Sequence, residues 1–147
     1  MAIHLDVQIA TRDHSIPAES DFRRWAGGIQ SSDTDATACL RIVDKEEARA
    51  LNHRFRKVDK ATNVLSFPAS LPEGVDMNFL GDVVICAPLV AEEATRQGKD
   101  AHAHWAHLLV HGILHLQGYA HDKDDEAEEM EALETAILGQ LGVRNPY

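Results

Sequence analysis

The sequence has 147 residues and a formal net charge of −10, with 44% hydrophobic and 26% charged residues, which suits one globular domain with one core. No segment approaches the roughly 18 apolar residues of a membrane span, and the first residues lack the basic and apolar blocks of a signal peptide, so a cytoplasmic protein without a membrane partner is expected. Cys39 and Cys86 are the only cysteines, and both lie in apolar runs, which favours buried free thiols over a disulfide.

The first part of the chain predicts alternating strands and helices. Residues 3–10 alternate apolar and polar side chains, as a strand with one buried face does. A helix is expected from Pro17 onward, and residues 36–44 predict a second strand. Asp44 is expected to cap a helix over residues 45–55. The inner face of that helix should carry Ala48, Leu51, Asn52 and Phe55.

The rest of the chain predicts two further strands and three helices. Residues 62–68 and 80–88 read as strands that prolines end, and residues 88–98 as a helix that closes at a glycine. Residues 102–117 are apolar nearly all round, which is typical of a helix buried inside a fold. Residues 124–142 predict a last helix with its acids facing outwards. Together these elements predict one α+β domain with a small mixed sheet of four strands, flanking helices and a buried central helix that bears histidines.

The charge is distributed unevenly along the chain. Seven of the fourteen Lys and Arg residues fall between Arg41 and Lys60, against four acids there, whereas residues 122–134 hold eight acids and one lysine. A uniformly acidic surface would repel the phosphates of a nucleic acid. The basic segment therefore leaves two interpretations open: a basic side that binds nucleic acid, or a solvated helix face without a partner.

The stretch HGILHLQGYAH carries three histidines with the spacing of a metal site. Residues four apart share one side of a helix, so His111 and His115 can bind the same ion, and Gly118 lets the chain turn so that His121 can reach it. Three imidazoles leave the fourth position of a tetrahedral Zn²⁺ to water, which is typical of a catalytic site. We therefore predict one Zn²⁺ per chain, held by these three histidines and a water. Two other histidines of this helix are interpreted as packing residues or as supports of the ligands: His104 and His107.

The same spacing occurs in zinc peptidases of the pattern H-E-x-x-H-x-x-G-x-x-H, but Gly112 occupies the position of their catalytic glutamate. Without that general base, a peptidase would need an acidic residue that folding brings beside the open metal position. Cleavage of a phosphodiester chiefly needs positive charge around its transition state, which a metal and a guanidinium can supply. The motif therefore favours phosphodiester chemistry over proteolysis.

Four stretches resemble the YbeY family, the bacterial single-strand-specific, zinc-dependent endoribonucleases of ribosomal RNA maturation. They are LNHRFRKVDKATNVLSFP (51–68), LGDVVIC (80–86), HWAHLLVHGILHLQGYAH (104–121) and DDEAEEMEALE (124–134). The resemblance places the zinc ligands at the same three histidines, His111, His115 and His121, and a functional arginine at Arg56. Arg56 would clamp the scissile phosphate or neutralise the transition state, whereas the residue alone would favour a surface ion pair.

The resemblance also implies a biological setting. It implies processing of ribosomal RNA, notably at the 3′ end of the small-subunit RNA, and ribosome quality control. The partners would be single-stranded RNA, the small ribosomal subunit and its assembly factors, and no DNA is expected. A non-catalytic ribosome-assembly factor with a structural metal and, last, a metallopeptidase are the alternatives. The family motif G-Y-D-H reads GYAH here, so Ala120 should lower metal affinity or rate, and Asp122 could substitute in part.

Overall fold

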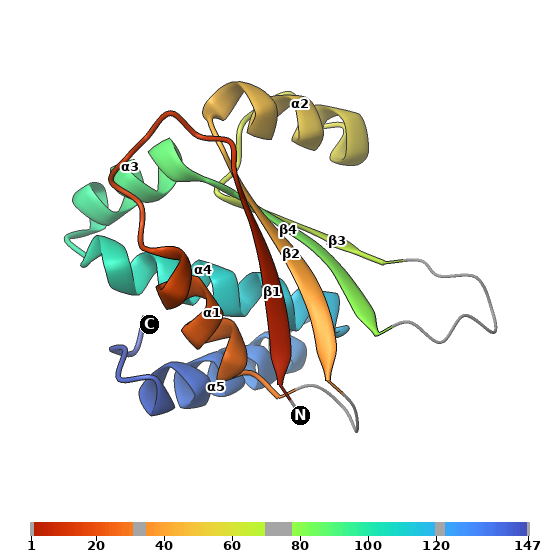
Figure 1. Ribbon diagram of the computed structural model, residues 1–147, viewed down its shortest axis with the longest axis vertical. Helices are drawn as coiled ribbons and strands as arrows, with labels where there is room; N and C mark the ends of the chain where they lie inside the picture. Colours follow the sequence, from red (N-terminus) through yellow and green to blue (C-terminus); the bar gives the residue numbers. More distant parts are fainter. Residues whose placement is uncertain (1, 31–34, 70–77, 120–122, 147) are drawn as a thin grey trace.

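The computed structural model of the protein describes residues 2–30, 35–69, 78–119 and 123–146. These residues form four strands and five helices (Figure 1). The strands are β1 (Ile3–Ile9), β2 (Ala36–Val43), β3 (Val64–Pro68) and β4 (Phe79–Cys86). The helices are α1 (Glu19–Gly27), α2 (Lys45–Arg56), α3 (Ala87–Gln97), α4 (Ala101–Leu116) and α5 (Asp124–Gln140). The predicted α+β domain is confirmed.

The four strands form one mixed sheet in the order β1-β2-β4-β3. The β1–β2 and β2–β4 pairs are parallel, and β3 runs antiparallel to β4 at one edge. Parallel neighbours need a crossover, which α1 supplies between β1 and β2 and which α2 and β3 supply between β2 and β4. The order puts β1 and β3 at opposite edges of the sheet.

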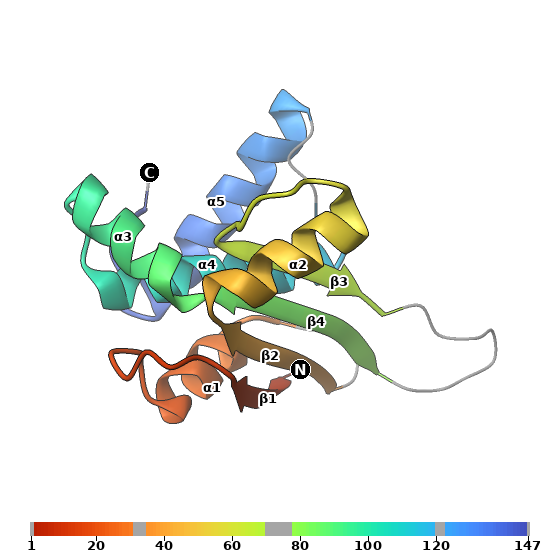
Figure 2. The ribbon, with the colours of Figure 1, turned by 90° about the horizontal axis from the view of Figure 1, so that it is seen from above.

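Helices cover both faces of the sheet (Figure 2). Because side chains alternate along a strand, Val83 and Ile85 point into the main core with α1 and α4, whereas Val84 and Cys86 pack with Ala48 of α2 on the other face. Helix α5 lies against α4 on the side away from the sheet. Helix α4 is therefore enclosed between the sheet and another helix.

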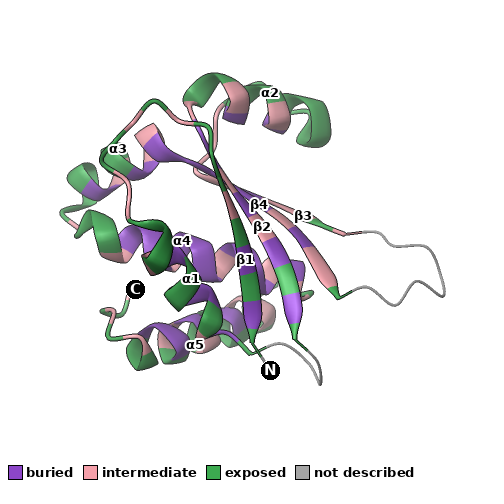
Figure 3. Cartoon of the chain, in the orientation of Figure 1, coloured by how far each residue is buried: buried purple, intermediate pink, exposed green. Residues whose placement is uncertain are grey.

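Helix α4 is buried along most of its length, as predicted (Figure 3). Trp105, Leu109 and Ile113 are nearly or fully inaccessible to solvent. Between residues 108 and 116 the two partly exposed residues are His111 and His115. In the described part of the chain, no helix combines the length and the apolar character that crossing a bilayer would require.

Three local expectations are wrong. Asp44 occupies the N-cap position of α2 as predicted, but its carboxylate makes no cap hydrogen bond and instead accepts hydrogen bonds from the Thr11 hydroxyl (2.5 Å) and from Arg12 Nε (3.0 Å). Phe55 does not lie inside, because 55% of its surface is exposed. Glu134 of α5 does not face outwards, because it is fully buried. For Asp44 and Glu134 the cause is the same: a partner from a distant segment decides where the side chain lies.

The two cysteines are free, as predicted, although only Cys86 is buried and Cys39 is half-buried. Burial raises the pKa of both thiols above the usual value. A thiol with a raised pKa is a poor nucleophile and a poor metal ligand at neutral pH. The cysteines therefore contribute packing to the fold.

Candidate functional site

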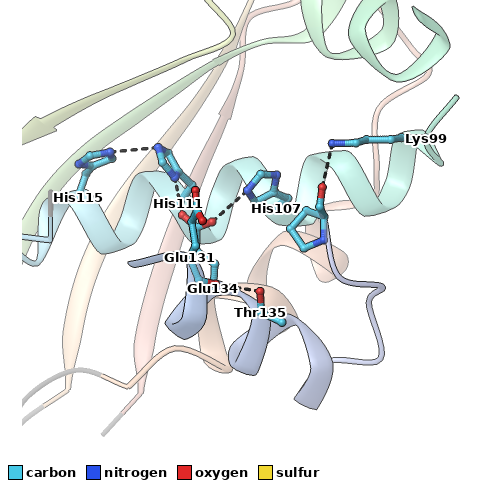
Figure 4. A network of polar contacts seen from close by, with 8 residues as sticks. Lys99, His107, His111, His115, Glu131, Glu134 and Thr135 are labelled. Atoms are coloured by element: carbon cyan, nitrogen blue, oxygen red, sulfur yellow. Dashed lines mark hydrogen bonds and ion pairs between the residues drawn. The ribbon is translucent and has the colours of Figure 1, made fainter. Parts of the chain in front are cut away.

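Two of the three predicted metal ligands lie side by side on α4. The Nε2 atoms of His111 and His115 are 3.0 Å apart (Figure 4). Two nitrogens that bind one tetrahedral Zn²⁺ at about 2.0 to 2.1 Å lie about 3.3 Å from each other. The spacing of this pair and its chemistry as neutral imidazoles therefore fit one zinc ion, with only a small adjustment of the rings.

The third predicted ligand, His121, lies outside the described residues, as do Ala120 and Asp122. The turn that leads towards it is described. Gly118 has a φ of 98°, and the backbone N–H of Tyr119 donates to the carbonyl of Leu114 (3.1 Å). The predicted end of α4 at Gly118 is therefore confirmed, and the position of His121 remains an expectation.

Glu134, which the sequence did not single out, holds His111 from the side opposite His115 (Figure 4). Its Oε1 lies 2.5 Å from His111 Nδ1, and its Oε2 lies 3.1 Å from His107 Nε2. An ionised carboxylate can only accept hydrogen bonds, so this contact keeps a proton on Nδ1 of His111. The Nε2 atom that faces His115 is then the one with a lone pair for a metal.

The group His107, His111 and Glu134 could also hold an ion itself, because one ligand atom from each residue lies within 4.8 Å of the others. That arrangement would use the imidazole nitrogens and carboxylate oxygens that now meet in hydrogen bonds. It would also move the His111 proton to Nε2, away from Glu134. The two arrangements therefore compete for His111. His111 and His115 line one pocket, whereas His107 lines a different one.

Carboxylates partner both of the other histidines in the α4 stripe. His104 is buried, with its Nε2 atom 3.0 Å from Glu93 Oε1. The same carboxylate accepts a hydrogen bond from the Asn63 amide (3.0 Å). Asn63 lies on the pocket wall described next, so this contact ties the wall to the interior of the protein.

A pocket of about 400 Å³ brings together residues from three parts of the chain. Helix α4 supplies His111 and His115, and the end of α2 supplies Arg56. The remaining wall comes from β3 and the residues before it: Thr62, Asn63, Val64, Ser66 and Pro68. The structure thus places the predicted arginine and two predicted metal ligands on one cavity.

The cations of the basic segment fall into two sets. Three form ion pairs: Arg41 with Glu47, Lys45 with Glu92, and Arg49 with Asp59. The other four form no ion pair within the described residues and lie at the end of α2 and just after it: Arg54, Arg56, Lys57 and Lys60. We refer to these four as the basic end of α2. The positive charge of the basic end of α2 is therefore available to bind an anion. The surface ion pair that was the alternative for Arg56 is not found among the described residues.

Gly112 faces the sheet. A Cβ atom at this position would lie 2.7 Å from Cγ1 of Val83 and 3.4 Å from Oγ of Ser66. The Ser66 hydroxyl also donates to the Gly112 carbonyl (3.0 Å). A glutamate therefore cannot occupy this position without a shift of Val83 or of α4, and the described residues of the pocket wall include no carboxylate. The acidic residue that a peptidase would need is missing from this part of the site.

Comparisons with known proteins agree with one another. Residues 8–142 match the family described as Endoribonuclease YbeY. A relative named Endoribonuclease YbeY, from Pseudomonas entomophila (strain L48), is 52% identical over 147 residues, which cover 99% of this chain and 93% of the relative. A solution structure from Thermotoga maritima is 23% identical, covers 92% of this chain and 91% of that chain, and has a TM-score of 0.52. This last likeness concerns the fold.

Proposed function

The chain belongs to the Endoribonuclease YbeY family, and on that premise we propose that it is a metal-dependent endoribonuclease that cleaves single-stranded RNA. One observation carries the proposal: Arg56, His111 and His115 line one pocket. A metal and a guanidinium on the same cavity are the groups that phosphodiester cleavage requires.

The metal would be Zn²⁺, held by His111, His115 and His121. When bound, it would supply a Lewis acid and lower the pKa of a coordinated water to about 7. The protein prepares for the ion through Glu134, which holds the Nδ1 proton of His111 and directs Nε2 towards His115. Because Glu134 is fully buried, its carboxylate is held in place and its contact with His111 is not weakened by competing water.

Arg56 would bind the scissile phosphate. Its planar guanidinium can donate to two phosphate oxygens at once and opposes the negative charge that grows on them in the transition state. No described carboxylate forms an ion pair with Arg56, so phosphate would not have to displace one. The rest of the basic end of α2 would attract the neighbouring phosphates of the strand.

The proposed biological role follows the family resemblance. The substrate would be ribosomal RNA, notably at the 3′ end of the small-subunit RNA, and the role would include ribosome quality control in the cytoplasm. Partners would be the small ribosomal subunit and its assembly factors. The open pocket, and the cations beside it that form no ion pair with the described residues, support an extended polyanion as the substrate.

Cleavage of a single-stranded ribosomal RNA fragment by zinc-loaded protein tests the proposal. Arg56→Ala and His115→Ala should each reduce the rate by roughly 100-fold or more, because the first removes the guanidinium and the second removes a ligand of the metal that would stabilise the transition state. Arg23→Ala is a matched control: it also removes a surface arginine, one that pairs with Glu19 on α1, and it should cleave like the unmodified protein. Equal cleavage by all four proteins would assign the activity to a contaminant and overturn the proposal.

The same preparations separate the alternatives. Zinc-loaded protein that binds ribosomal RNA, unfolds more easily after chelation and cleaves nothing would identify an assembly factor with a structural metal. Protein without any bound zinc after purification free of chelators would contradict both readings of the histidines. If the protein hydrolysed a peptide substrate and His115→Ala abolished that hydrolysis, the result would support the metallopeptidase alternative.

A further inference from the structure

Phe55 is a large aromatic residue that the fold leaves exposed. Its side chain is 55% accessible, although it stands one residue from the end of a helix whose other face packs on the sheet. Its ring meets the ring of Phe67 edge to face, with 5.1 Å between centroids and 62° between planes. The guanidinium of Arg54 lies 5.2 Å from its centroid. The ring is thus held from two sides while much of its surface stays open.

This aromatic surface adjoins the pocket of the candidate site. Phe55 directly precedes Arg56 of the pocket wall. Phe67 lies between two wall residues of β3, Ser66 and Pro68, and its own side chain packs on the α2 side of the sheet. Consecutive Cα atoms are about 3.8 Å apart, so the backbone of both aromatic residues adjoins the backbone of that wall, at the edge of the sheet where α2 meets β3. A strand whose phosphate met Arg56 would have an adjacent nucleotide next to Phe55.

The surrounding charge identifies the kind of partner. The basic end of α2 carries four cations without an ion pair among the described residues, and Phe55 lies between two of them in the chain. An apolar protein segment would have to desolvate these cations, whereas a nucleic acid would pair its phosphates with them. Aromatic rings flanked by cations are how proteins bind unpaired bases.

We propose that Phe55, braced by Phe67 and Arg54, is a stacking platform for one unpaired base of RNA beside the scissile phosphate. The inference rests on the proposed endoribonuclease function and adds a source of its specificity. A base that is paired in a duplex has its faces covered by its neighbours, so only an unstacked base can lie on the ring. The platform would therefore favour single strands over duplexes before any cleavage takes place.

Two probes of equal charge test the platform. One is an oligoadenylate about ten nucleotides long, within the usual site size of such surfaces, and the other has the same sugar-phosphate backbone without bases. Phe55→Ala in the zinc-loaded protein should weaken binding of oligoadenylate roughly 5- to 150-fold, which corresponds to the usual contribution of one stacked base. Binding of the abasic strand should not change, and Phe55→Trp should bind oligoadenylate at least as well as the unmodified protein.

Ile9→Ala is the matched control, because Ile9 is another exposed large apolar residue (49%) and lies on β1 at the opposite edge of the sheet. It should bind both probes normally. Unfolding curves of each variant check that the fold is intact. Equal loss of both probes by Phe55→Ala would overturn the platform, because a stacking residue cannot affect a strand without bases.

The outcomes separate this inference from the nuclease proposal. If Phe55→Ala binds oligoadenylate normally while Arg56→Ala abolishes cleavage, the platform is wrong and the nuclease stands. If oligoadenylate binding depends on Phe55 and the unmodified protein never cleaves RNA, the platform stands and the nuclease is wrong. Each probe is checked on a gel after titration, so that binding is measured on intact strands.

Discussion

Gly112 determines how closely α4 can approach the sheet, so its replacement is the simplest test of that packing. Gly112→Ala adds a Cβ atom 2.7 Å from a methyl of Val83, which is itself fully buried. Alanine gains up to about 1 kcal/mol of helix propensity, but overpacking a core costs about 1 to 3 kcal/mol. We expect the variant to lose about 1 to 2 kcal/mol of unfolding free energy in urea titrations.

Gly139→Ala provides the control, because Gly139 is also within a helix but a Cβ atom there would have no neighbour within 4 Å. It should gain up to about 1 kcal/mol from propensity alone. If both variants are stabilised equally, α4 has room to move and Gly112 is not a packing requirement.

Glu134 should matter for metal affinity. Glu134→Gln keeps the shape of the side chain but removes the charge that supports the Nδ1 proton of His111. Loss of such a partner typically lowers metal affinity 10- to 100-fold. Competition titrations with a coloured zinc chelator measure this directly. Glu131→Gln removes the same charge from an exposed position of α5 and should leave zinc affinity unchanged, so equal losses would point to a general effect of charge.

At the scale of elements, α2 and α3 end in the same left-handed conformation with different residues. Lys57 has a φ of 62° and is the only residue other than glycine with a positive φ in the described ranges, whereas α3 ends at Gly98 with a φ of 64°. A side chain costs about 1 to 2 kcal/mol in this region. Lys57→Gly should therefore raise the unfolding free energy by about 1 kcal/mol.

The reciprocal change at α3 controls for the conformation. Gly98→Ala should lower stability by about 1 kcal/mol, since a Cβ atom there has no neighbour within 4 Å and only backbone strain acts. Chemical denaturation of both variants checks the pair. Destabilisation by Lys57→Gly would mean that the lysine side chain, whose Nζ donates to the Arg54 carbonyl, outweighs the strain.

The elements themselves were predictable where a local pattern determines them. Alternation along β1 and the apolar surface of α4 depend on the residues of each element alone, and both predictions are confirmed. The order of the strands was not predictable, because it depends on contacts between distant segments. Glu134 could have been noticed, because it lies four residues after buried Met130 on one helix face, but it was hidden in a run of acids.

At the scale of the whole molecule, the candidate site also combines features that local sequence determines with features that depend on contacts between distant segments. The spacing of His111 and His115 predicted their proximity, because one helical turn determines it. The neighbourhood of Arg56 depends on α2, β3 and α4 packing together, so composition could suggest a basic side but could not locate it. The resemblance supplied that link, and the position of His121 stays a prediction because it falls outside the described residues.

Polar contacts also connect α2 and the residue before it to neighbouring strands and loops. Arg41 of β2 donates to Glu47 of α2 through Nε (2.6 Å) and Nη2 (2.9 Å). Hydrogen bonds from Arg41 lower the pKa of Glu47, and hydrogen bonds from Thr11 and Arg12 lower the pKa of Asp44. Both carboxylates are therefore better stabilised as anions in the folded state than in the unfolded chain.

These shifts predict an acid-sensitive fold. A carboxylate whose pKa is lowered by folding stabilises the protein above its unfolded pKa of about 4, and the contribution disappears as the pH falls through the folded pKa. Stability should therefore decline below about pH 5 and most steeply below about pH 4.

The variant Glu47→Gln tests this prediction. It lacks the stabilisation by the Glu47 carboxylate even at neutral pH, so its unfolding free energy should fall less between about pH 5 and pH 3. Glu128→Gln, an exposed carboxylate of α5 without an ion pair among the described residues, should follow the unmodified protein. A Glu47→Gln curve parallel to both would show that the pair with Arg41 does not hold α2 to the sheet.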